Sequence, residues 1–157
     1  MRALLTLPLI FVSSFALAED SKHLSAKDGV EVLHAWVPAT SHDHGRIYME
    51  IANEGAADVV LVKASSDIAD EIVLVALDYT ADGAKEKALG AFPIKANAEI
   101  DLTPDGLFLE VDGLNKPLNE GDEFEIRLVF DPIGALDVHV AVEATDATQH
   151  SHAGHSH

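Results

Sequence analysis

The last nine residues, 149–157, read QHSHAGHSH and place four histidines among Ser, Ala and Gly: His150, His152, His155 and His157. Imidazole nitrogens bind Cu(II), Zn(II) and Ni(II), and a flexible polar chain can wrap several of them around one ion. The composition therefore predicts a metal-binding tail, whose affinity falls below about pH 6.5 because protonated imidazole is no longer a ligand. Two alternatives stay open: an expression tag, which the mixed spacing disfavours, and a disordered terminus without a function.

A second histidine pair lies in the segment SHDHG, residues 41–45. His42 and His44 are two residues apart, and in an extended segment such residues project to the same side. Two imidazoles placed in this way suit one Cu(II), Zn(II) or Ni(II) ion, with Asp43 or a water completing the ligand set. The alternative is a solvated polar turn without a ligand.

Three further histidines stand alone. His23 lies on the N-terminal arm, where it is able to reach a metal, although an ordinary exposed side chain is the simpler interpretation. Period-two alternation places His34 on the same face as Val32 and Trp36, which predicts a partly buried structural histidine. His139 alternates with the apolar residues of its strand and is expected to face solvent. If the first and last strands are neighbours, His34 and His139 approach one another.

The elements that must position these side chains follow an export signal. Arg2 precedes an apolar run at 4–15, and Ala16-Leu17-Ala18 is an A-x-A cleavage site, so residues 1–18 are predicted to be a secretory signal peptide. The apolar run is too short to span a bilayer. We therefore expect an exported, periplasmic protein that is not inserted in the membrane after cleavage. It would have a flexible arm at 19–29, one folded domain at 30–144 and a disordered His-rich tail at 145–157.

Composition limits the partners and the kinds of ligand. The 157 residues include 27 acidic and 10 basic side chains, a net charge of −17, and loss of Arg2 with the signal peptide leaves 9 basic side chains and −18. Such an acidic protein attracts cations rather than nucleic acid or anionic lipid. The chain has no Cys, which excludes disulfides and thiolate ligands, and Met49 is the only thioether after residue 18.

From Val30 onward, short apolar-alternating runs are separated by turn residues. Eight of these runs have the length and composition of β-strands, and no segment has the pattern of a long amphipathic helix. Regularly spaced short strands are typical of a β-sandwich or barrel. The predicted strands are residues 30–37, 46–53, 58–65, 71–77, 98–103, 107–111, 123–130 and 136–144.

Several phrases of the sequence resemble the periplasmic copper chaperones called PCu(A)C. These phrases are HAWVPAT (34–40), GRIYMEIANEGAADVVLVKASSDIAD (45–70), LTPDGLFLEVDGLNKPLNEGDEFEIRLVF (102–130) and VHVAVE (138–143). The resemblance covers roughly residues 30–143. It implies an all-β fold, a cupredoxin-like Greek-key β-sandwich, which agrees with the eight predicted strands.

Members of that family typically hold Cu(I) with two histidines and two methionines. The matching positions in this sequence are Val75, Lys85 or Lys87, Phe108 and Glu110. None of these side chains is an imidazole or a thioether, the ligands on which a His/Met site for Cu(I) depends. The resemblance therefore implies the fold, and no ligand of the family is carried over.

We expect an exported copper-binding protein, a copper chaperone or metal-delivery protein, that binds Cu(II) through histidines. Zinc is possible as the metal, because ligand type alone does not separate the two ions. The expected partners are the metal ion and a periplasmic or membrane copper protein. The alternative is a non-metal periplasmic interaction module whose tail is an independent zinc or copper buffer. We expect no enzymatic activity, because the sequence has no G-x-S-x-G, phosphate loop or H-E-x-x-H.

Overall fold

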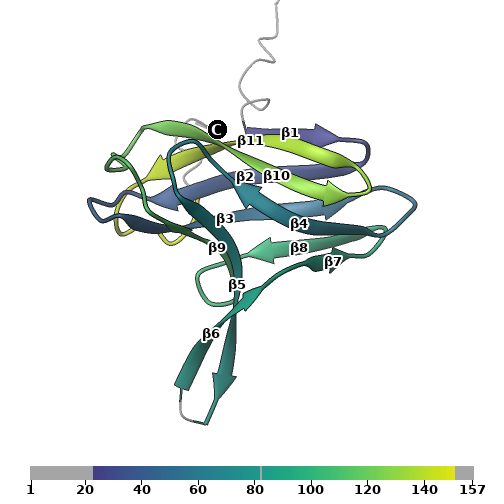
Figure 1. The fold of residues 1–157 in the computed structure, drawn as a ribbon, viewed down its shortest axis with the longest axis horizontal. Helices are drawn as coiled ribbons and strands as arrows, with labels where there is room; N and C mark the ends of the chain where they lie inside the picture. The colour runs from purple at the N-terminus through teal and green to yellow at the C-terminus, as the bar shows by residue number, and fades with distance from the viewer. Residues whose placement is uncertain (1–22, 82, 151–157) are drawn as a thin grey trace, which may run out of the picture.

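The computed structural model describes residues 23–81 and 83–150, which fold into strands joined by turns (Figure 1). In chain order the strands are β1 (Leu24–Lys27), β2 (Val30–Pro38), β3 (His44–Asn53), β4 (Val59–Ser65), β5 (Glu71–Thr80), β6 (Gly83–Leu89), β7 (Phe92–Ile94), β8 (Ala98–Leu102), β9 (Leu107–Asp112), β10 (Glu123–Asp131) and β11 (Gly134–Glu143). The predicted all-β class is confirmed. Within these ranges, no helix has the length and apolar character needed to cross a membrane. The predicted signal peptide at 1–18 and residues 151–157 of the predicted tail lie outside the described residues.

The described chain has eleven strands, three more than the sequence predicts. The additional strands β1, β6 and β7 lack an alternating apolar pattern, and every residue of β6 except Leu89 is exposed. Backbone pairing with one neighbour holds each of them: β1 with β2, β6 with β5, and β7 with β4. The arm expected to be flexible at 19–29 therefore contains a paired strand at residues 24–27.

The strands form one sheet in the order β6-β5-β9-β8-β3-β2-β11-β10-β4-β7, with β1 attached to β2. β5 also pairs with β4, through Ala64 and Ile72, so the sheet returns on itself and encloses an interior. Strand β2 pairs in parallel with β11, which brings the first long strand beside the last one. Both ends of the described chain consequently lie in the same region, and the β5–β6 hairpin projects away from the rest of the sheet (Figure 1).

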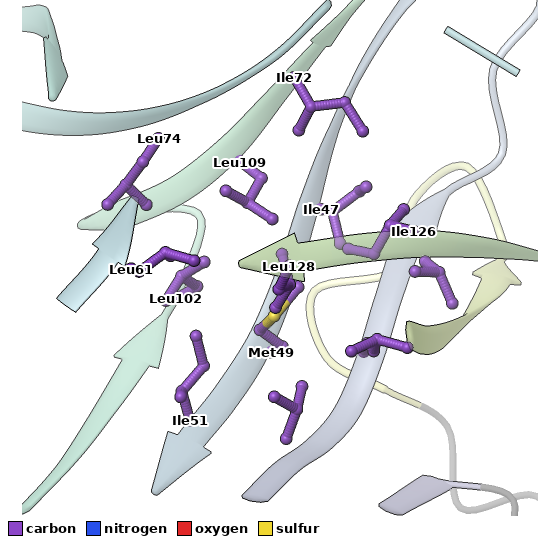
Figure 2. Close-up of a cluster of buried hydrophobic side chains, with 14 of the residues drawn as sticks. Ile47, Met49, Ile51, Leu61, Ile72, Leu74, Leu102, Leu109, Ile126 and Leu128 are labelled. Carbon is purple, nitrogen blue, oxygen red and sulfur yellow. The ribbon is translucent and has the colours of Figure 1, made fainter. Parts of the chain in front are cut away.

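The main core fills this interior with aliphatic side chains from both halves of the sheet. In β10, exposed charged residues alternate with buried Phe124, Ile126, Leu128 and Phe130, so the sequence pattern also fixes which face turns inward. Figure 2 shows core side chains from six strands converging: Ile47, Met49, Ile51, Leu61, Ile72, Leu74, Leu102, Leu109, Ile126 and Leu128.

A second, smaller cluster is buried on the opposite face of the sheet. It consists of Trp36, Tyr48, Val75 and Phe108, and we call it the aromatic cluster. Each member is flanked in the sequence by a residue of the main core, so period-two alternation turns it to the other face of its strand. The rings of Trp36 and Tyr48 lie 4.8 Å apart between centroids.

Strand β2 contains a β-bulge between Leu33 and Trp36, and beyond it the residues that face the main core belong to the other alternating set. Leu33 pairs with Glu50 and Trp36 pairs with Tyr48, so two residues of β2 occupy the space opposite one residue of β3. His34 has a left-handed backbone, with φ of 50°. The prediction that His34 shares a face with Val32 is wrong, because the extra residue shifts the alternation: Val32 lies in the main core, whereas His34 lines the same outer cavity as Trp36.

Asn53, at the end of β3, is the buried polar side chain that fixes a turn. Its exposed fraction is 1%. Its amide donates to the carbonyl oxygens of Ala57 (2.9 Å), Lys95 (3.1 Å) and Ile94 (3.2 Å), and its side-chain oxygen accepts from the backbone N–H of Gly55 at 3.1 Å. One side chain therefore joins the β3–β4 turn to the end of β7.

Replacement of Asn53 by alanine should lower the free energy of unfolding by about 2–4 kcal/mol, because buried backbone groups lose their partners. Urea denaturation of the variant and the parent measures this difference. Asn119→Ala is the matched control, because Asn119 bonds in an exposed turn to Asp122. Equal losses for the two variants would contradict the role given to Asn53.

Candidate metal site

Three histidine rings from distant parts of the chain come together on the outer face of the sheet. His23 precedes β1, His34 lies in the bulge of β2, and His150 follows β11. The ring centroids are 4.7 Å apart for His23 and His150, 5.6 Å for His34 and His150, and 6.4 Å for His23 and His34. We call these three residues the histidine cluster.

The pairing of the strands explains why these residues meet. Leu24 of β1 pairs with Leu33 of β2, so the residue before β1 lies beside the residue that follows Leu33. At the other end of the chain, β11 runs parallel to β2 and ends with Glu143 opposite Pro38. The chain then turns, with the N–H of Ala147 donating to the carbonyl of Ala144 at 2.9 Å, and His150 reaches the outer face of β2.

His150 is the most buried member of the histidine cluster, with an exposed fraction of 8%. The first part of the segment predicted to be a disordered tail, residues 145–150, contacts the sheet through Ala147 and His150. Nδ1 of His150 lies 2.8 Å from Oε1 of Glu143, within ion-pair range. A carboxylate at this position favours a proton on Nδ1, which makes Nε2 the nitrogen suited to bind a metal.

The ring centroids of the histidine cluster are spaced much as in imidazoles that share one ion, whereas in residues 23–81 and 83–150 only Glu50, Glu99 and Asp101 have ligating atoms that all lie within 4.8 Å of one another. With metal–nitrogen distances of about 2.0–2.1 Å and tetrahedral angles, imidazole centroids lie roughly 5 Å apart. The three measured centroid distances, 4.7, 5.6 and 6.4 Å, lie around that value. Binding would require the ligating nitrogens to turn towards one point, a side-chain rotation that leaves the strands in place. Three imidazoles, of which His150 is oriented by Glu143, are a type of ligand set that suits Cu(II) or Zn(II).

A cavity of about 280 Å³ gives access to the cluster from solvent. His34, His150, Glu50 and Asp101 are among the residues that line it. The two carboxylates belong to a group with Glu99, in which the ligating oxygens all lie within 4.8 Å of one another. The negative charge at this mouth attracts cations towards the imidazoles.

The sequence analysis did not identify this carboxylate group. Glu50 lies on β3, and Asp101 and Glu99 lie on β8, where Glu50 and Asp101 are directly paired. Partial burial raises the pKa of Glu50 above its usual value, and the neighbouring Glu99 and Asp101 charges raise it further. Alternating acidic residues on two strands were visible in the sequence, but their meeting depends on a strand register that the sequence does not reveal.

The structure also brings together the predicted pair His42 and His44. Their rings stack with centroids 5.4 Å apart and planes inclined by 16°. Nδ1 of His44 lies 3.2 Å from Oδ1 of Asp43, and all three residues are exposed in the turn before β3 and at its start. His139 is exposed on β11, opposite Glu125. His152, His155 and His157 lie outside the described residues.

The positions that match the family's Cu(I) ligands contain no metal-binding group for a soft ion. Val75 and Phe108 belong to the aromatic cluster, and the guanidinium of Arg46 lies 4.4 Å from the centroid of the Phe108 ring. Arg46 also forms an ion pair with Glu86 of β6. Burial raises the pKa of Glu110, and the charges of nearby acidic residues raise it further. A cation and an aromatic ring thus occupy the region where the resemblance places copper.

A family model described as "Putative lipoprotein LpqE-like" matches residues 30–142. The chain belongs to the LpqE-like family. It is also 28% identical over 129 residues to the putative lipoprotein Lxx21020 of Leifsonia xyli subsp. xyli, an alignment that covers 81% of this chain and 77% of that protein.

Solved structures with the same fold are PCuAC domains, which confirms the predicted family resemblance and the β-sandwich. The apo PmoF2 PCuAC domain has a TM-score of 0.67 at 21% identity and covers 81% of this chain and 99% of its own. The copper-bound PCuAC domain from PmoF2 has a TM-score of 0.66 at 21% identity, over 78% of this chain and 98% of that one. The solution structure of CuI-DR1885 from Deinococcus radiodurans has a TM-score of 0.58 at 25% identity, over 71% and 76% of the two chains.

Replacement of Glu50 by glutamine should raise the free energy of unfolding at pH 7 by about 0.2–1 kcal/mol, because it removes a like-charge cross-strand pair. The pKa of Glu50 is raised in the folded state, so its ionisation lowers stability above the folded-state pKa. This destabilisation by ionised Glu50 disappears as the pH falls below the pKa of Glu50 in the unfolded state. The Glu50→Gln variant and the parent should therefore have equal free energies of unfolding near pH 3.

Urea denaturation at pH 7 and pH 3 measures the difference. Glu123→Gln is the control, because Glu123 is exposed on β10 and pairs with Ala141. A stability gain of equal size at both pH values would contradict the electrostatic explanation.

Proposed function

We propose that this protein is an exported copper-binding protein that holds Cu(II) with His23, His34 and His150 and delivers it to another copper protein. The histidine cluster is the observation that carries the proposal, because three imidazoles meet beside a carboxylate-lined cavity. Two structural relatives support copper as the metal: one PmoF2 domain is copper-bound, and the DR1885 structure contains CuI. The signal-like N-terminus and the lipoprotein relatives support export.

The available donors favour Cu(II) over Cu(I). Met49, the one thioether after residue 18, is 3% exposed in the main core and also lines the cavity beside His34 and His150, so a site with two methionine ligands cannot be built there. The chain has no Cys. Imidazole and carboxylate groups suit Cu(II) and Zn(II), and Cu(II) is bound more tightly at equal availability.

Two other histidine groups would serve the same function. His152, His155 and His157 follow the cluster in the sequence and would collect metal, since a His-rich composition is typical of metal-binding tracts. The stacked pair His42 and His44 would provide a second, exposed site. A strongly acidic chain would raise the concentration of cations around all of these groups.

Copper titration of two full-length variants tests the proposal. In a parent with His152, His155 and His157 replaced by asparagine, we expect one tightly bound Cu(II), since the cluster is intact. Adding His34→Asn should raise the dissociation constant of that ion about 100-fold or more. Loss of a ligand should weaken metal binding more than loss of a group that only orients a ligand, which typically weakens it about 10–100-fold. Asparagine suits this position because it tolerates the left-handed backbone of His34.

His139→Asn in the same parent is the control, because His139 is exposed on β11, opposite Glu125. It should leave the tight dissociation constant unchanged. If the parent loses all tight binding with its tail histidines, the body does not hold the metal. An independent tail buffer on a non-metal interaction module would then be the better interpretation.

Replacement of both His42 and His44 by alanine should lower the number of bound Cu(II) ions by one and leave the tightest ion in place. The pair is exposed and lies in a different turn from the histidine cluster, so the two sites should respond separately. Metal counting after equilibrium dialysis measures the change. Unchanged stoichiometry would remove the second site from the proposal.

A further inference from the structure

The segment that follows β11, residues 144–150, folds back over the aromatic cluster. Ala147 packs against that cluster from outside, and His150 is buried three residues later. The residues around these two anchors, Thr145, Asp146, Thr148 and Gln149, are exposed. The segment is therefore fixed to the sheet at two points, one apolar and one an imidazole of the proposed metal site.

Without a metal, the segment is held by the packing of Ala147 on the aromatic cluster and by His150, whose Nδ1 lies 2.8 Å from Oε1 of Glu143 at the end of β11. Ordering a stretch of chain costs backbone and side-chain entropy at every residue, whereas burial of one alanine methyl group returns only a small hydrophobic gain. A metal ion bound by His150 together with His23 and His34 would add to these contacts, because ligands from the segment and from the sheet would then share one ion. Docking of the segment and binding of the metal would therefore strengthen one another.

We propose that residues 144–150 are a metal-operated latch: a divalent ion in the histidine cluster closes the segment over the aromatic cluster, and its loss releases the segment. This inference rests on the proposed function, because it uses the same ion. Binding linkage makes the effect reciprocal. Displacement of Ala147 from the aromatic cluster therefore weakens metal binding by the same factor by which the metal strengthens docking, which gives a recipient protein a route to release the ion.

Zinc binding to full-length variants tests the latch through a residue that has no ligand atom in its side chain. The parent again has His152, His155 and His157 replaced by asparagine. Ala147→Gln introduces a longer polar side chain against the aromatic cluster and should raise the dissociation constant for Zn(II) at least tenfold. Thr145→Gln is the matched control in the same segment, and it should change the constant less than twofold because Thr145 is exposed. Competition with a chromophoric chelator measures both values.

Hydrogen exchange of the parent provides a second readout that needs no substitution in the segment. Saturating Zn(II) should slow the exchange of the amides of residues 145–150 at least tenfold, and it should not do so in the His34→Asn variant. Trp36, the only tryptophan of the chain, lies under the segment. Its emission should therefore shift with Zn(II), a d¹⁰ ion without redox activity.

The two proposals fail in different ways. If the parent binds no Zn(II) or Cu(II) tightly, the metal site and the latch are both overturned. If it binds the ion but the exchange of residues 145–150 is unchanged, or Ala147→Gln binds as tightly as the parent, the latch alone is overturned and the metal site stands.

Discussion

One extra residue in β2 determines how the two faces of this sheet are used. At the bulge, Leu33 pairs with Glu50 and Trp36 with Tyr48, so the inward and outward positions of the strand are exchanged on its far side. Without that exchange, Trp36 would turn towards the main core and His34 would follow Val32 into it. The bulge therefore creates the aromatic cluster and the outward histidine together. The cavity, the contact with Ala147 and the meeting of the three imidazoles all depend on it.

The sequence predicts the strands that bury an apolar face and misses those that do not. Eight alternating runs are strands, whereas β6, which is almost wholly exposed, is held by backbone bonds that leave no pattern of side chains. The site was predictable only as a collection of histidines. Their meeting requires the parallel pairing of β2 with β11 and the left-handed residue His34, which is neither Gly nor Asn and so gives no local signal.

The fold keeps the architecture of PCuAC domains while its outer face carries different chemistry. Side chains at the positions of the family's soft ligands are Val75, Phe108 and Glu110, with Arg46 lying over the phenyl ring. Apolar packing and a fixed cation leave that region unsuited to a metal. Two of the candidate ligands, His23 and His150, lie near the ends of the described chain and the third, His34, lies in β2, and all three would offer imidazole in place of thioether. A change of donor atoms of this kind changes the preferred oxidation state without any change in strand order.

The proposed metal site combines residues from the beginning and the end of the folded part, so it can form only late in folding. His23 is among the first residues of the folded part to leave the ribosome and His150 is among the last, yet their rings lie 4.7 Å apart in the folded chain. The edge of β2 that pairs in parallel with β11 likewise stays unpaired until β11 has been made. A chain that has not yet formed β11 therefore lacks the complete set of proposed ligands. Metal loading at the proposed site would therefore follow the folding of the whole domain.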